Sequence, residues 1–412
     1  MLTAQFVPPL PLYFDVATSM ALGTTIAAAL IILMCWLSEA FAPAMSPRPT
    51  FESAVGSVVA VITIIALILI HAIVADALLP IDVARSIGSL IPLAFLVGGG
   101  FKFGTAFLKC ADRTVDFAAS VSLLALFAVI VLEFSGLQPR LAAFPKSMFP
   151  FTEISHFALA LTPILLYFCV RAKRSGSLWW VIGGFALALS LQSVALVAGC
   201  VLAALVCRRL LLVALAAGLL LIAGLPLGFE YYASRLNFSG SVLNLSNLVY
   251  VQGWQMVPES FARTLGWGLG FNQLGVRGTD VPAAVFIHAI TGGDEANITD
   301  GSFVFSKLAS EFGVLGVLLS FVYVFAAAHC VRALRKGGGR AAIVLAQCVV
   351  VAYGVDMFVR GTGYFVQSTF LFVAASTALL ANGRAGKLQV WTRSVLRNGV
   401  TRESLQPTDE FK

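Results

Sequence analysis

The chain has 412 residues, of which 59% are hydrophobic and only 11% are charged, and its mean hydropathy is +0.92. A soluble protein of this length carries about twice that charged fraction, so the composition excludes an ordinary soluble domain. The formal net charge of +7 does not indicate a nucleic-acid partner, because the basic residues of a membrane protein gather in its cytoplasmic loops.

Long apolar runs predict an all-α, polytopic membrane protein that forms a single transmembrane domain over residues 1–412. About 20 apolar residues are needed to cross a bilayer, and ten apolar runs, with the run at 178–207 counted as two short helices, predict about 11 membrane helices. The runs lie, in chain order, at 17–37, 54–76, 87–108, 117–136, 154–170, 178–207, 210–228, 302–328, 341–359 and 363–382.

Basic clusters at 109–113, 171–174, 207–209 and 332–340, together with a tail at 383–412, are expected on the cytoplasmic side. The run 178–207 joins two of these clusters, so a single crossing would place one of them outside. We therefore predict a short hairpin at 178–207, with its turn at the polar break "SLQS" (190–193). The N-terminus is then outside and the C-terminus inside.

This orientation places three segments outside: the loop around 137–152, a large loop at 229–301 and the turn around Arg360. The large loop is rich in aromatic residues and glycine. Its part at 245–262 is expected to form an amphipathic helix on the membrane surface. Long ordered loops on a rigid scaffold tend to carry function, so candidate site residues are sought here and at the outer helix ends.

Glu153 and His156 lie three residues apart where a helix is expected to begin, so they share a face. One interpretation is helix capping, with Thr152 as the N-cap and Glu153 favoured by the positive helix end. Capping does not explain His156. The alternative is a proton acceptor or a ligand clamp formed by the carboxylate and the imidazole.

Asp300, Lys307 and Glu311 are spaced seven and four residues apart, which places them within about 40° of one another on a helix. A polar stripe therefore enters an otherwise apolar helix. Lys307 and Glu311 could form a self-satisfied pair that holds helices together. Asp300 has no obvious partner in that interpretation, which makes it the better functional candidate.

Asp356 and Arg360 are four residues apart and could pair on one helix face, either as a structural pair or with Asp356 aiming the guanidinium. The sequence "RGTG" (360–363) lets the backbone leave the helix just after the arginine. The large loop adds Arg235, Arg263 and Arg277, which could be merely solvated. Arginine matches phosphate oxygens bidentately, so several arginines beside apolar grooves suit a lipid-linked pyrophosphate.

The chain shows no cofactor signature. Its four histidines lack metal-ligand spacing, and no phosphate-binding glycine loop follows a strand. We therefore expect neither a metal nor a nucleotide cofactor.

Four stretches together resemble the O-antigen polymerase family of bacterial membrane enzymes, from about residue 145 onward. They are "FTEISHFAL", the loop pair "LSNLVYVQGWQM" and "GWGLGFNQLG", the helix entry "DGSFVFSKLASEFGVLG", and the turn "DMFVRGTGYF". Ile154 departs from the family's pattern, in which proline is common. The related O-antigen ligases carry a histidine after the large loop, where this chain has Asn297 and Asp300, so the resemblance favours a polymerase.

The resemblance implies a metal-independent glycosyltransferase that depends on polyprenyl pyrophosphate, in the bacterial inner membrane with its active site facing the periplasm. The donor would be a growing glycan on undecaprenyl pyrophosphate and the acceptor a single repeat unit on the same carrier. A flippase and a chain-length regulator are implied as partners by the resemblance alone, beside the lipid bilayer, and no nucleic acid is. Alternatives are an O-antigen ligase, which transfers glycan to a lipid A core, and a secondary transporter of an anionic substrate.

Under this resemblance the candidate residues take three roles. The expected roles are catalysis for Asp300, Glu153 and His156, pyrophosphate binding for Arg360, Arg235, Arg277 and Arg263, and support for Asp356, Tyr364, Lys307 and Glu311.

Overall fold

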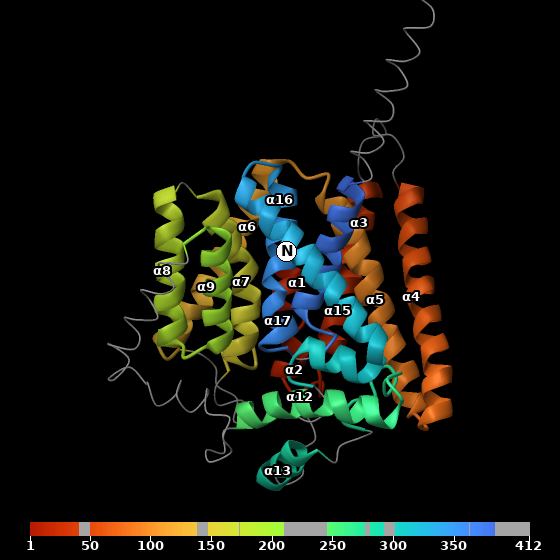
Figure 1. Cartoon of the computed structure of the whole chain (residues 1–412). Helices are drawn as coiled ribbons and strands as arrows, with labels where there is room; N and C mark the ends of the chain where they lie inside the picture. The colour runs from red at the N-terminus through yellow and green to blue at the C-terminus, as the bar shows by residue number, and fades with distance from the viewer. Residues whose placement is uncertain are drawn as a thin grey trace, which may run out of the picture.

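The structure is a computed structural model, and it describes residues 1–40, 50–137, 147–172, 174–209, 245–276, 281–291, 301–361 and 363–383. These residues form helices that run side by side, with one helix laid across their ends (Figure 1). Seven of the described helical segments are long and apolar enough to cross a membrane. The expected all-α, multi-pass membrane architecture is therefore confirmed.

The N-terminal part begins with two short helices that the sequence did not predict, α1 (Leu2–Phe6) and α2 (Leu10–Tyr13). Four long helices follow: α3 (Ala21–Ala40), α4 (Thr50–Leu78), α5 (Val83–Phe107) and α6 (Asp112–Phe134). Glycines let α5 approach a neighbour closely, because a Cβ on Gly104 would lie 2.2 Å from the carbonyl oxygen of Ala374. Ala374 belongs to the last described helix, 367–383.

The middle of the chain confirms the predicted hairpin. Helix α7 (Ile154–Arg171) is followed by α8 (Arg174–Ser190) and α9 (Val194–Val206), which are separated at the predicted polar break. The side chain of Ser193 caps α9 by accepting a hydrogen bond from the Leu196 amide at 3.3 Å. At 1.5 Å per residue the two helices are only about 26 and about 20 Å long, shorter than the other spans. The run predicted at 210–228 lies outside the described residues.

The C-terminal part contains α12 (Leu245–Arg263), α13 (Pro282–Thr291), α15 (Val304–Lys336), α16 (Ala341–Ala352) and α17 (Gly354–Phe358). Helix α12 lies across one end of the bundle, with α13 beyond it (Figure 1). This is the arrangement expected for a surface helix at 245–262. We call this end of the molecule the α12 end.

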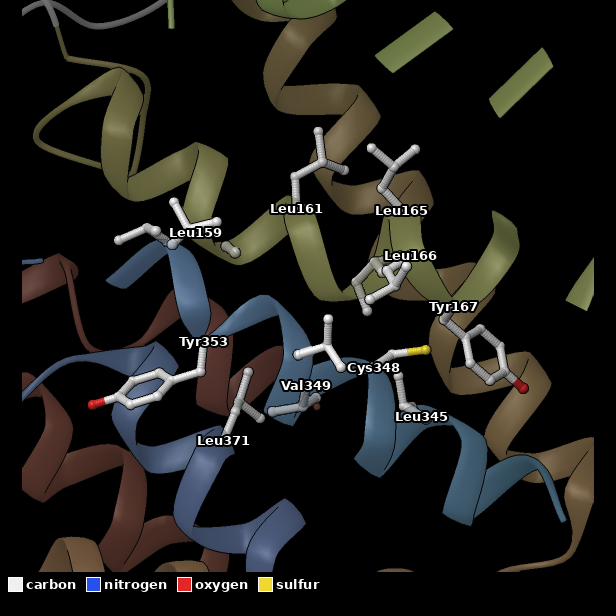
Figure 2. Packing of buried hydrophobic residues seen from close by; sticks show 14 of the residues in the cluster. Leu159, Leu161, Leu165, Leu166, Tyr167, Leu345, Cys348, Val349, Tyr353 and Leu371 are labelled. Carbon is white, nitrogen blue, oxygen red and sulfur yellow. The ribbon is translucent and has the colours of Figure 1, made fainter. Parts of the chain in front are cut away.

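Apolar packing between α7, α16 and the helix 367–383 forms the centre of the bundle (Figure 2). Leu166, Tyr167 and Cys348 are fully buried there. In contrast, α4 and the second half of α15 expose continuous apolar stripes, which suits a lipid environment. These stripes include Val58, Ile62, Ile70 and Ile73 on α4, and Leu318, Val322 and Phe325 on α15.

The predicted cytoplasmic clusters meet at the opposite end of the bundle, which we call the basic end. Arg340 donates to the carbonyl oxygens of Leu108 and Cys110, and Arg335 donates to that of Leu205. Arg171 forms an ion pair with Asp116 at 2.9 Å. Both ends of the hairpin therefore return to the same end of the molecule, as the orientation argument required.

Candidate functional site

Arg360 lies just beyond the last turn of α17, at the α12 end. Its amide donates to the carbonyl oxygen of Val355 at 2.9 Å, and the next amide, of Gly361, donates to the carbonyl oxygen of Ser302 at 2.8 Å. A Cβ at Gly361 would lie 3.0 Å from the Asp356 carbonyl oxygen, so the chain turns in a tight space. The backbone therefore leaves the helix before Gly361, as predicted, and is hydrogen-bonded to Ser302, just before α15.

The guanidinium of Arg360 reaches across to the start of α7. Its Nη2 donates to both carboxylate oxygens of Glu153, at 3.0 and 3.3 Å. The two residues are 207 positions apart in the chain. The Arg360 side chain is 20% exposed and that of Glu153 is 46% exposed, so the pair lies at the surface of this end and is open to a ligand.

The expected pairing of Asp356 with Arg360 is wrong. Asp356 is buried, at 1% exposure, and accepts a hydrogen bond from the Ser368 hydroxyl at 2.6 Å. The physical reason is that α17 ends at Phe358, so Arg360 is no longer on the helix and the four-residue spacing does not bring the two side chains together. Asp356 belongs to the interior of the bundle and does not aim the guanidinium.

Glu153 is the N-cap residue of α7, but its side chain makes no capping hydrogen bond. Its carboxylate accepts from Arg360 and from the Ser155 hydroxyl at 2.7 Å. The Arg360 charge holds the pKa of the Glu153 carboxyl well below its ordinary value of 4.5. Glu153 is therefore an anion at neutral pH and a weak base.

His156 lies beneath this pair, 4% exposed, on the first turn of α7. Its Nδ1 is 2.9 Å from the Thr152 hydroxyl, so Thr152 serves the imidazole and not the helix end, contrary to the capping interpretation. Within the described residues, its Nε2 is buried without a hydrogen-bond partner. Gln367 adds a second polar contact, because its amide donates to the His156 carbonyl oxygen at 3.3 Å.

Lys307 and Glu311 form the predicted pair on α15, with 4.0 Å between Nζ and Oε1 and exposures of 5% and 0%. The Lys307 ammonium also lies 5.3 Å from the ring centroid of Tyr364. The Glu311 carboxylate accepts from the amides of Asn272 and Leu274, at 2.9 and 3.1 Å. Glu311 therefore clamps the loop 264–276 onto α15, which is a structural role.

The clamp sits at a break in α15 that the sequence analysis missed. Gly313 has φ 55° and ψ −131°, and the loop 264–276 fills the gap. The amides of Leu269 and Gly270 donate to the carbonyl oxygens of Ser310 and Glu311, both at 2.9 Å. The signal was the run of glycines in "GWGLGF", since a Cβ on Gly268 would lie 2.5 Å from the Glu311 carbonyl oxygen.

Of the remaining predicted arginines, the structure describes only Arg263, and it is not brought to Arg360. Arg263 pairs with Glu259 on α12 at 2.5 Å, and it lies 13 residues, about 20 Å of helix, from Tyr250, which contacts α17. The predicted residues Asp300, Arg235 and Arg277 lie outside the described residues.

Comparison with protein-family models, with curated proteins and with solved structures finds no match for this chain. The side chains at the α12 end therefore carry the functional proposal, together with the resemblance of the four stretches. Within the described residues they bring together an arginine, a carboxylate and a buried imidazole at one end of a membrane bundle.

Proposed function

We propose that this protein is a membrane glycosyltransferase that polymerises oligosaccharide repeat units linked to undecaprenyl pyrophosphate. The α12 end would face the periplasm of a bacterial inner membrane. The observation that carries the proposal is the Arg360–Glu153 pair, which places a guanidinium at the N-terminus of α7 and at the end of a membrane bundle. An arginine and the free amides of a helix N-terminus both favour phosphate oxygens.

In the proposed reaction an acceptor hydroxyl oxygen attacks the anomeric carbon of the donor glycan. The bond from that carbon to the pyrophosphate oxygen breaks, and undecaprenyl pyrophosphate leaves with the electron pair. Negative charge grows on the leaving group in the transition state, and Arg360 is placed to stabilise it. No nucleotide is consumed, because the pyrophosphate carrier is itself the leaving group.

The hydroxyl proton needs an acceptor, and the candidates are Glu153 and His156. The pKa of Glu153 distinguishes between them. Glu153 is a weak base because Arg360 lowers its pKa, so we assign it to orienting the acceptor hydroxyl. His156, whose Nε2 has no partner in the described part of the chain, is assigned to accept the proton. A pyrophosphate that binds Arg360 competes with Glu153 for the guanidinium. When the Arg360–Glu153 ion pair separates, the acceptor hydroxyl can reach His156.

Arg360→Ala tests the proposal in cells and with purified protein. We expect cells with this variant to carry glycan of a single repeat unit, and the purified variant in nanodiscs to release no undecaprenyl pyrophosphate from a lipid-linked donor. Arg360→Lys keeps the charge but loses the planar fork, so partial activity is expected.

The matched control is Arg171→Ala, which removes an arginine from a carboxylate pair of similar length at the basic end. It is expected to leave the glycan ladder unchanged. Long chains of normal length with Arg360→Ala, at equal protein in the membrane, would refute the role of Arg360.

A further inference from the structure

A cluster of aromatic side chains lies at the α12 end, beside the Arg360 turn. Trp254 on α12 lies 5.2 Å from the ring centroid of Phe303 and 5.6 Å from that of Phe305. Tyr250 packs on Phe303 at 5.0 Å, and Phe358 packs on Phe305 at 5.9 Å. These five rings form one contiguous cluster from α12 through the start of α15 to α17.

The cluster contains one fully buried ring and one exposed ring. Phe303 is fully buried, whereas Trp254 is 46% exposed. Within α12, which the structure describes in full, Trp254 is the one large apolar side chain that is exposed. Its indole N–H donates to no group in the described part of the chain. The indole therefore rests on Phe303 and Phe305 and leaves both ring surface and a hydrogen-bond donor to a ligand.

The surroundings of Trp254 differ from those of a lipid-facing ring. On α4 the exposed apolar side chains form a continuous stripe. On α12 the exposed positions that follow Trp254 at helical spacing are Pro258 and Ala262, and Arg263 comes next. The apolar neighbours of Trp254 on this face, Val251, Val257 and Phe261, are half-buried and form no exposed stripe, so the lipid measurement below decides between membrane insertion and ligand binding.

The cluster is also joined directly to the Arg360 turn. The Tyr250 hydroxyl donates to the Phe358 carbonyl oxygen at 3.4 Å, two residues before Arg360. Gly253 lets α12 approach the start of α15, because a Cβ there would lie 2.9 Å from both the Gly301 oxygen and the Phe303 ring. The aromatic cluster therefore contacts the segment that carries Arg360, two residues before it.

We propose that Trp254, backed by Phe303 and Phe305, binds a pyranose ring of the glycan next to the pyrophosphate site. The C–H groups on one face of a pyranose form an apolar patch that stacks on an aromatic face, and the surrounding hydroxyls accept from a donor such as an indole N–H. The inference rests on the proposed function and adds its carbohydrate subsite. It assigns Trp254 to substrate binding, outside the bond-making step.

Binding is measured with full-length protein in nanodiscs, labelled with 5-fluorotryptophan. The probe is glycan released by mild acid from the lipid-linked oligosaccharides that accumulate in cells lacking this chain. The Trp254 resonance is assigned by its loss in Trp254→Phe. We expect the glycan to shift this resonance and to leave that of Trp179 in place, a control ring on α8 that is 71% exposed.

Spin-labelled lipids in the same nanodiscs distinguish the membrane explanation. We expect them to broaden the Trp179 resonance and to spare that of Trp254. A Trp254 resonance that is broadened by the lipids and not shifted by the glycan would overturn the inference.

Variants give a second, independent measurement. Trp254→Ala is expected to raise both the Kd of the released glycan and the KM of the lipid-linked acceptor about tenfold, with kcat unchanged. Trp254→Phe keeps a ring and should lose only about two- to threefold. Since this variant preserves the packing on Phe303, it remains informative if Trp254→Ala does not fold.

Failure of the subsite and failure of the proposed function give different results. If wild-type protein polymerises the glycan but Trp254→Ala has an unchanged KM and Kd, the subsite alone is wrong. If cells lacking this chain accumulate no lipid-linked glycan, both are wrong. Arg360→Ala should still bind the released glycan, because that probe carries no pyrophosphate.

Discussion

Glu311→Gln is the sharpest test of how the α12 end is held together. The wild-type carboxylate is fully buried, accepts from the amides of Asn272 and Leu274, and faces the Lys307 ammonium. Glutamine has the same shape, but it keeps only one acceptor oxygen and loses the charge. Its amide nitrogen meets one of the two backbone amides, so a buried donor is left without an acceptor.

The size of the effect follows from these contacts. A hydrogen bond to a charged group contributes about 1.5–3 kcal/mol, and a buried unsatisfied donor costs about 1–3 kcal/mol. Allowing for relaxation, we expect the loop 264–276 to lose about 3 kcal/mol of protection against opening. Each 1.4 kcal/mol is a factor of ten, so its amides should exchange about 100-fold faster.

Hydrogen exchange measured by mass spectrometry on peptides that span 268–276 is the assay. The matched control is Glu259→Gln, which removes the carboxylate of another four-residue ion pair, to Arg263, that is about one-third exposed on both sides. An exposed pair contributes about 0–1 kcal/mol, so exchange at 268–276 should not change. Equal exchange in Glu311→Gln and wild type would refute the clamp.

Two further predictions concern the same end of the molecule. Gly268→Ala should lower the Tm by several degrees, because its φ is +101° and the new Cβ would lie 2.5 Å from the Glu311 oxygen, whereas Gly183→Ala, with nothing within 4 Å, should be neutral or slightly stabilising. For pH, Arg360 lowers the folded-state pKa of Glu153, so the pair stabilises the fold above the ordinary pKa of 4.5 and loses this effect as the pH falls below it. The Tm difference between wild type and Glu153→Gln should thus be constant above about pH 5 and shrink below it; a difference that grows on acidification would contradict the assigned sign.

The membrane helices and the hairpin could be predicted from the sequence because they depend on local hydropathy and on the distribution of basic residues. The partner of Arg360 could not. The four-residue rule pointed to Asp356, but it holds only inside a helix, and α17 ends before Arg360. Glu153 was identified as a candidate from its place at a helix start, yet nothing local indicates a contact across 207 positions.

The break in α15 was missed for a related reason. A glycine within an apolar run is compatible with a continuous helix. Only the segment that packs against Gly313 shows that the helix is broken there. That segment is the loop 264–276, about 40 residues earlier in the chain. From sequence, its glycines indicate only an outer segment rich in turns. The predicted run at 302–328 ends eight residues before α15, which reaches Lys336, and it gave no sign of the break.

A broken membrane helix is also a feature of secondary transporters, in which freed backbone groups at the break bind substrate or ions. Here three of those groups have partners in the loop 264–276. The carbonyl oxygens of Ser310 and Glu311 accept from the loop 264–276, and the amide of Val314 donates to the Gly266 oxygen at 2.9 Å. The loop 264–276 thus fills the break, and these three groups are not available to bind a substrate or an ion.

What the break does instead is to fix the first turns of α15. The half-helix that begins at Val304 is bound at its far end, at Ser310 and Glu311, by the loop 264–276. Just before its start, the Ser302 carbonyl oxygen accepts a hydrogen bond from the amide of Gly361. Arg360 is therefore fixed on both sides, by this contact on its backbone and by Glu153 on its guanidinium. In the proposed reaction such a guanidinium would be pre-organised for the anionic leaving group, because little reorganisation would remain to be made when the charge develops.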